Sequence, residues 1–242
     1  MSEASSTPLN IGPWAEGDPM TDTVWKALVT EPNTGIGIFA IDGTIMYMNE
    51  QSARFLRGPA GKASDFIGRN VSEFWPKPWV DERKAILHKV LETGKPVLLR
   101  TIWKGYQQLA WIHHIASETP EPTEDEAGPG QEAPDQFLTI TRRVGGDDKA
   151  EELAGEFETV ESEVADLGPL EVLTPRELEV LALLGQGLSL KQIAKVLYRS
   201  VKTVDNHRAS IGKKLAIDDR VKLAEIAFRA GLTVRDAERE RV

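Results

Sequence analysis

One short segment in the last third of the chain carries side chains that could bind nucleic acid. Between residues 202 and 214, lysine, arginine and histidine are interspersed with threonine, aspartate, asparagine and serine. Amide, carboxylate and hydroxyl groups can hydrogen-bond to base edges in the DNA major groove, and lysines can neutralise phosphates. These residues therefore suggest sequence-specific DNA binding. The alternative is the solvated face of an ordinary helix.

Four predicted helices over 174–232 would position this segment. Thr174 precedes Pro175 and lies three residues before Glu177, which is the pattern of an N-cap, a first-turn proline and a capping box. Only three residues, 198–200, separate the second and third helices, which is typical of a helix-turn-helix. The third helix, with the segment in its first turns, would lie in the major groove. The four helices are predicted to begin after Thr174, Ser189, Ser200 and Asp218 or Asp219.

The same region closely resembles the LuxR-type helix-turn-helix of bacterial transcription regulators. It shares the opening LTPRE, then EVL-x-LL-x-x-G, K-x-IA-x-x-L, S-x-x-TV-x-x-H and KL-x-x-x-x-R. The resemblance implies dimeric binding to double-stranded DNA, with Asp205, Asn206 and Ala209 facing bases. The residues expected near the DNA backbone are Lys191, Thr203, His207, Lys213 and Lys214, and Lys202 and Arg208 complete the predicted DNA-binding set. Ala209 departs from some relatives, which have lysine or arginine there, so base readout at this position is either weaker or favours a thymine methyl.

The distribution of charge agrees with DNA binding, although the formal net charge of the chain is −9. Residues 174–234 contain eleven basic and six acidic residues, whereas residues 1–173 contain fifteen basic and twenty-nine acidic ones. Basic charge is therefore concentrated in the predicted helix-turn-helix, as expected of a nucleic-acid-binding module. The acidic remainder should repel DNA and discourage non-specific binding.

Several classes of protein are disfavoured by composition. The chain contains no cysteine, which excludes disulfides, thiolate zinc sites and cysteine nucleophiles. Its N-terminus is polar and acidic, unlike a signal peptide, and no apolar run approaches the ~20 residues of a membrane span. No catalytic constellation, P-loop or dinucleotide motif is present. We therefore expect a cytoplasmic protein that is not an enzyme and has no metal site.

Residues 21–145 are predicted to form an α+β domain. Strands are expected over 35–42, 44–49, 97–106, 109–117 and 136–144, with short helices and one long amphipathic helix between them, so the fold is an antiparallel sheet with helices on one face. The region resembles a PAS sensor domain by the run G-I-x-x-x-D-G-x-I-x-x-x-N and the later G-x₆-W-P and E-x-G-K-P.

The PAS resemblance implies a pocket between sheet and helices, which holds haem, flavin, a small metabolite or nothing. The candidate pocket residues are Trp75, Trp79, His88, Trp103, Trp111 and His113; the alternative is that they are core or surface residues. Haem-binding relatives place their histidine about a turn and a half before His88, nearer Arg83, which disfavours haem. A flavin–cysteine adduct is impossible without cysteine, whereas non-covalent flavin stays open.

Residues 147–168 are predicted to form a connecting helix. Leu153, Phe157, Val160, Val164 and Leu167 are spaced 4, 3, 4 and 3 residues apart, which is an a/d heptad stripe. One interpretation is a coiled-coil dimer seam that couples the sensor to the DNA-binding domain. The other is packing of this stripe against the sheet of the same chain.

The remaining segments complete the predicted domain organisation. Residues 1–20 are expected to be disordered, and 116–135 form an acidic loop with seven acids and no bases, either a tolerated insertion or an arm that competes with DNA. The helix-turn-helix domain spans 170–234, and 235–242 are a tail. The function that this organisation predicts is a dimeric one-component transcription regulator. The alternatives are a cofactor-free PAS module that receives its signal from a protein partner and, less well supported, a sigma-factor-like protein.

Overall fold

The computed structural model describes residues 19–115, 134–145, 150, 155 and 157–242. The predictions of a disordered N-terminus, an acidic loop and a seam position at Leu153 therefore fall largely or wholly outside the described residues. Within the described ranges, no helix is both long and apolar enough to cross a lipid bilayer.

The N-terminal domain is built on a six-stranded sheet. The strands are β1 (Thr34–Ala40), β2 (Ile45–Met48), β3 (Val97–Trp103), β4 (Tyr106–Ile115), β5 (Gln136–Arg143) and β6 (Glu158–Glu161). Their order is β2-β1-β5-β4-β3-β6, and every pair is antiparallel except β3 with β6. The predicted α+β class is confirmed.

Helices cover one face of this sheet. They are α2 (Glu50–Arg57), the 3₁₀ turns η1 (Ala63–Asp65) and η2 (Val71–Glu73), and α3 (Lys77–Thr93). Helix α1 (Pro19–Thr30) instead contacts β2 through Trp25 and Tyr47, whose ring centroids lie 5.7 Å apart. Asn49 caps α2 by accepting a hydrogen bond from the Ser52 N–H, and Gly94 ends α3 in the left-handed conformation with φ 64°. Side chains of α2, α3 and the inner sheet face enclose one cavity, which places the two helices on the same face.

The predicted connecting helix is wrong from residue 157 on, although Ala150, within the predicted range, is helical. Residues 158–161 form β6, and β7 (Val164–Ala165) follows, so the chain runs parallel along the edge of β3. A short acidic helix that packs against nothing has little stability of its own. The edge strand of a sheet, in contrast, has unpaired backbone N–H and C=O groups that a further strand can bond. An acidic side chain of β6 also forms an ion pair at this edge: Glu158 pairs with Lys89 of α3 at 2.6 Å.

The proposed dimer seam fails with that helix, and the alternative of packing within the chain is correct. Phe157 contacts His113 edge-to-face, with ring centroids 5.3 Å apart, and Val160 packs against the core between sheet and α3. Val164 is buried in β7, and Leu167 is buried in the core of the C-terminal helices. None of these four side chains is available as an exposed seam.

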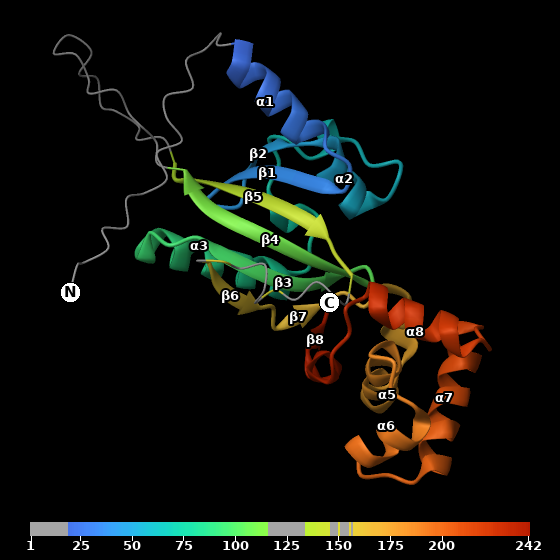
Figure 1. The fold of residues 1–242 in the computed structure, drawn as a ribbon. Helices are drawn as coiled ribbons and strands as arrows, with labels where there is room; N and C mark the ends of the chain where they lie inside the picture. Colours follow the sequence, from blue (N-terminus) through green and yellow to red (C-terminus); the bar gives the residue numbers. More distant parts are fainter. Residues whose placement is uncertain (1–18, 116–133, 146–149, 151–154, 156) are drawn as a thin grey trace, which may run out of the picture.

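The C-terminal helices follow the sequence prediction closely. They are α5 (Pro175–Gly185), α6 (Leu190–Val196), α7 (Val201–Leu215) and α8 (Arg220–Arg229), preceded by the 3₁₀ turn η3 (Gly168–Val172). Thr174, Ser189, Ser200 and Asp219 are the N-caps, and each side chain accepts a backbone N–H bond from the first turn. In Figure 1 these helices gather at one end of the sheet, with α6 and α7 far from it.

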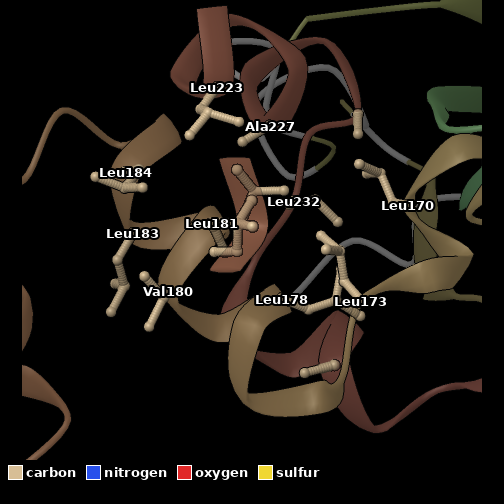
Figure 2. Close-up of a cluster of buried hydrophobic side chains, with 14 of the residues drawn as sticks. Leu170, Leu173, Leu178, Val180, Leu181, Leu183, Leu184, Leu223, Ala227 and Leu232 are labelled. Carbon is tan, nitrogen blue, oxygen red and sulfur yellow. The ribbon is translucent and has the colours of Figure 1, made fainter. Parts of the chain in front are cut away.

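Leucines from α5, α8 and the segments around them form one core. Figure 2 shows Leu178 and Leu181 of α5 with Leu223 of α8, flanked by Leu170 and Leu232. The same buried cluster includes Ile102 of β3 and Leu167, so the two domains share a core.

The predicted tail is also folded, and it pairs with the segment that follows β6. Residues 234–238 form the 3₁₀ turn η4 (Val234–Glu238), and β8 (Glu240–Arg241) pairs in parallel with β7.

Candidate DNA-binding surface and sensor cavity

Helix α7 presents a continuous exposed stripe. Lys202, Asn206, Ala209 and Lys213 are all exposed, and their spacing of 4, 3 and 4 residues places them on one helical face. The opposite face is buried, with Val204 and Ile211 each 0% exposed. A helix anchored in this way can lay its polar stripe in a groove of DNA without losing core contacts.

Two flanks border the stripe. On one flank, Asp205 accepts a 3.0 Å hydrogen bond from Arg208 Nε, so these predicted DNA contacts are paired with each other in this structure. On the other flank lie Thr203, whose hydroxyl is 2.8 Å from that of the N-cap Ser200, and the half-buried His207. Lys191 is exposed in the first turn of α6.

Lys214 has an internal partner, which the sequence did not indicate. Its Nζ donates to Glu177 Oε2 at 2.6 Å, and Ser210 Oγ donates to Glu177 Oε1 at 2.7 Å. Burial alone would raise the pKa of Glu177, but the hydrogen bonds from Lys214, Ser210 and Thr174 outweigh it and lower the pKa to about 2. Glu177 thus ties the start of α5 to α7, and Lys214 helps to hold α7 in place.

A cavity of about 130 Å³ lies between α2, α3 and the inner face of the sheet. The predicted residues Trp75, Trp79 and Trp103 line it, together with Arg83. The other lining residues are Phe39, Gly43, Met48, Ser52, Phe55, Leu56, Val71, Lys84, Leu87, Leu99, Thr101, Gln108, Ala110, Ile112, Thr139 and Thr141.

Four buried polar atoms of the cavity residues have no hydrogen-bond partner among the described residues. They are Trp75 Nε1, Thr101 Oγ1, Trp103 Nε1 and Gln108 Nε2, on side chains of residues no more than 7% exposed. A buried donor left unpaired costs about 1–3 kcal/mol. A ligand that accepts these bonds would recover part of that cost.

The other predicted pocket residues lie elsewhere. His88 is exposed on the outer side of α3, and Trp111 and His113 alternate with the cavity residues Ala110 and Ile112, so they face the opposite side of the sheet. Burial against Phe157 lowers the pKa of His113. At about 130 Å³ the cavity is smaller than the ~300–1,000 Å³ of drug-sized sites, so neither haem nor flavin fits it.

A buried ion cluster joins the sheet to the C-terminal domain, and sequence reasoning missed it. Arg100 of β3 bonds Asp236 through both terminal nitrogens at 3.2 Å, and its Nη1 donates to Glu161 at 2.8 Å. Its Nε donates to Gln107 at 2.9 Å and its Nη2 to the Gly231 carbonyl. We call Arg100, Gln107, Glu161, Asp236 and Arg239 the junction; Arg239 donates to Asp236 at 2.8 Å.

Strand β3 connects the cavity with the junction. Leu99, Thr101 and Trp103 line the cavity, whereas Arg100 and Ile102 point to the opposite face and contact the C-terminal domain. On the next strand Gln108 lines the cavity and its neighbour Gln107 belongs to the junction. The alternation of side chains along a strand therefore places one wall of the cavity directly behind the interdomain contact.

Comparison with known proteins adds a family for the C-terminal domain. Residues 171–227 match the model of bacterial regulatory proteins of the luxR family. Transcriptional regulatory protein LnrK of Bacillus subtilis (strain 168) is 50% identical over 62 residues, which are 26% of this chain and 28% of LnrK. Oxygen regulatory protein NreC of Staphylococcus aureus (strain JH9) is 41% identical over 64 residues, 26% of this chain and 30% of NreC. The chain thus spans less than a third of the length of either relative.

Two solved structures resemble larger parts of the chain. The Vibrio cholera VqmA–ligand–DNA complex aligns over 86% of this chain and 88% of that chain, with 19% identity and a TM-score of 0.43. The PAS domain of an HTR-like protein from Haloarcula marismortui aligns over 52% of this chain and 93% of that chain, with 18% identity and a TM-score of 0.32. The matched family model, the four capped helices and the exposed stripe of α7 agree with one another. The C-terminal part of the chain is a LuxR-type helix-turn-helix domain, joined to an α+β domain built on the six-stranded sheet.

Proposed function

We propose that the protein is a transcription regulator that binds a specific DNA sequence through α7 as a dimer, under the control of the PAS-like domain. The observation that carries this proposal is the exposed stripe of Lys202, Asn206, Ala209 and Lys213 on the second helix of a helix-turn-helix. The dimer is implied by the LuxR resemblance and predicts paired half-sites about 34–36 Å apart.

The controlling signal in this proposal is occupancy of the cavity. The unpaired donors of Thr101 and Gln108 favour a small molecule over a ligand-free domain that only binds a protein partner. A ligand that bonds these two residues acts on β3 and β4, whose adjacent residues Arg100 and Gln107 hold the C-terminal domain. Ligand binding would thereby change how the DNA-binding domain is held.

The experiment that tests this function is selection of binding sites from a random DNA pool, followed by a specificity profile for Asn206→Ala. A side-chain amide that pairs with a base contributes about 1–3 kcal/mol of discrimination, so the variant should relax the preference at one base step of each half-site and keep the rest. Binding to every single-base variant of the selected site gives the measurement.

The matched control is Asp218→Asn, in the exposed link between α7 and α8, which should leave the profile unchanged. If Asn206→Ala also leaves the profile unchanged, α7 does not read bases in the proposed way. If no sequence is enriched from the pool, specific DNA binding is disproved.

Lys213→Ala should weaken binding to all sequences about equally. Lys213 is exposed and, among the described residues, forms no ion pair, so its loss should remove a phosphate contact without disturbing the fold. We expect the slope of log affinity against log salt concentration to become shallower by about 1. Lys77→Ala, an exposed lysine in the first turn of α3, should leave the slope unchanged. An unchanged slope for Lys213→Ala would place that lysine away from the DNA backbone.

A further inference from the structure

The size of the cavity limits its ligand to about one ring. A cavity of ~150 Å³ lined by apolar side chains holds benzene, and the cavity here has about 130 Å³. A bicyclic or larger molecule would require the walls to move apart.

The walls favour a planar ligand. Trp75 and Trp79 are stacked, with ring centroids 4.9 Å apart and an interplanar angle of 12°, and Trp103 lies 5.9 Å from Trp79. Phe39 and Phe55 add two further aromatic walls. Aromatic rings pack well in offset or edge-to-face contact with such walls.

The polar groups of the cavity favour hydrogen-bond acceptors. The indole nitrogens of Trp75 and Trp103 can only donate, and the unpaired atom of Gln108 is its amide nitrogen. The Thr101 hydroxyl can donate as well. Arg83 and Lys84 line the cavity, whereas no aspartate or glutamate among the described residues does so. The ligand therefore meets donors and positive charge, and no carboxylate.

Arg83 carries its charge into this apolar environment. Its guanidinium lies over the Trp79 ring, 4.6 Å from the centroid, and Nη1 donates to Glu82 at 2.6 Å. Burial lowers the pKa of Arg83 to about 10, so the group stays protonated at neutral pH and its burial costs free energy. Glu82 is the counter-ion of Arg83, and its Oε2 also accepts the Ser162 hydroxyl at 2.7 Å.

We infer that the cavity binds a compact, single-ring organic anion whose ring packs among the tryptophans and whose charged oxygens are held by Arg83 and the buried donors. This inference rests on the proposed function, in which the cavity is the sensor site, and adds the chemical class of its ligand. A benzoate-like carboxylate is the simplest member of the class.

The test is calorimetric titration of the full chain with benzoate and with benzamide, which have nearly the same shape and differ in charge. A hydrogen bond to a charged group contributes enough to give benzoate at least about tenfold tighter binding. Arg83→Gln should remove this preference by weakening benzoate at least about tenfold, with little effect on benzamide. Lys77→Gln, on the exposed side of the same helix, should behave like the unmodified protein.

A second variant distinguishes the loss of the Arg83 charge from general damage to the folded cavity. Thr101→Val keeps the volume of the side chain and removes one unpaired donor, so it should weaken both molecules by a similar factor and keep the preference for the anion.

Three outcomes would overturn the inference. The first is that benzamide binds as tightly as benzoate or more tightly. The second is that Arg83→Gln leaves benzoate binding unchanged. The third is that neither molecule binds, in which case water is the hydrogen-bond partner of the buried donors. Each outcome is independent of site selection with Asn206→Ala, so DNA binding can hold even if the ligand class fails.

Discussion

Asp236→Ala is expected to destabilise the protein by about 3–5 kcal/mol, since it removes one partner of a buried ion pair. The Asp236 side chain is 0% exposed and bonds both Arg100 and Arg239. Burial alone would raise the pKa of Asp236, but the bonds from Arg100 hold it below its usual value. Without the carboxylate, two guanidinium groups remain close together at the junction.

Chemical unfolding followed by circular dichroism and tryptophan fluorescence measures this loss. Glu238→Ala, an exposed residue in the same 3₁₀ turn, should change the free energy of unfolding by less than about 0.5 kcal/mol. Combining Asp236→Leu with Arg100→Met should cost less than the sum of the two single changes, because it removes both charges. Equal stability of Asp236→Ala and Glu238→Ala would show that the junction does not hold the domains together.

Acidification should weaken the DNA-binding domain through Glu177. The pKa of Glu177 is lowered to about 2 from an ordinary value of 4.5, so its ionised form stabilises the folded state. This contribution, about 3 kcal/mol by linkage, is present in full above the unfolded-state pKa and is lost as pH falls from about 4.5 toward 2.

Glu177→Gln tests this pH dependence. The amide keeps the size of the side chain and cannot form the ion pair with Lys214, so the variant should be less stable at neutral pH and lose less stability on acidification. Glu225→Gln, at an exposed position of α8, should retain the full pH dependence. Parallel curves of stability against pH for Glu177→Gln and the unmodified protein, over about pH 2–5, would contradict the assignment.

The contrast between Lys213 and Lys214 follows from the same contact. Both were expected near the DNA backbone from the LuxR resemblance, but only Lys213 lies on the exposed stripe, and Lys214 is bonded to Glu177. Weaker DNA binding by Lys214→Ala would therefore arise partly from displacement of α7, which this lysine ties to α5. Measuring unfolding alongside DNA affinity separates the two effects.

Much of the helix-turn-helix was predictable because its signals are local. Thr174, Ser189 and Ser200 each satisfy backbone N–H groups within the next three residues, so a sequence window of one turn contains the whole interaction. The strands and long helix of the PAS-like domain were likewise visible from apolar periodicity and from turn residues such as Gly43 and Gly94.

The connecting segment could not be assigned in that way. A spacing of 4 and 3 between Phe157, Val160, Val164 and Leu167 suits a helix, but the β-branched valines also suit a strand, and the choice depended on a distant partner. That partner is the free edge of β3, 61 positions earlier at Arg100 and Glu161, whose backbone and side chain bind the segment.

The sequence by itself determined the local elements: the caps, the helix-turn-helix and the five strands from β1 to β5. The tertiary structure alone decided which tryptophans surround the cavity, which lysine of the pair at 213–214 bonds Glu177, and that Arg100 meets Asp236 across 136 positions. The physical reason is that hydrogen bonds within a turn are encoded by neighbours, whereas burial and charge pairing depend on which surfaces the whole fold brings together.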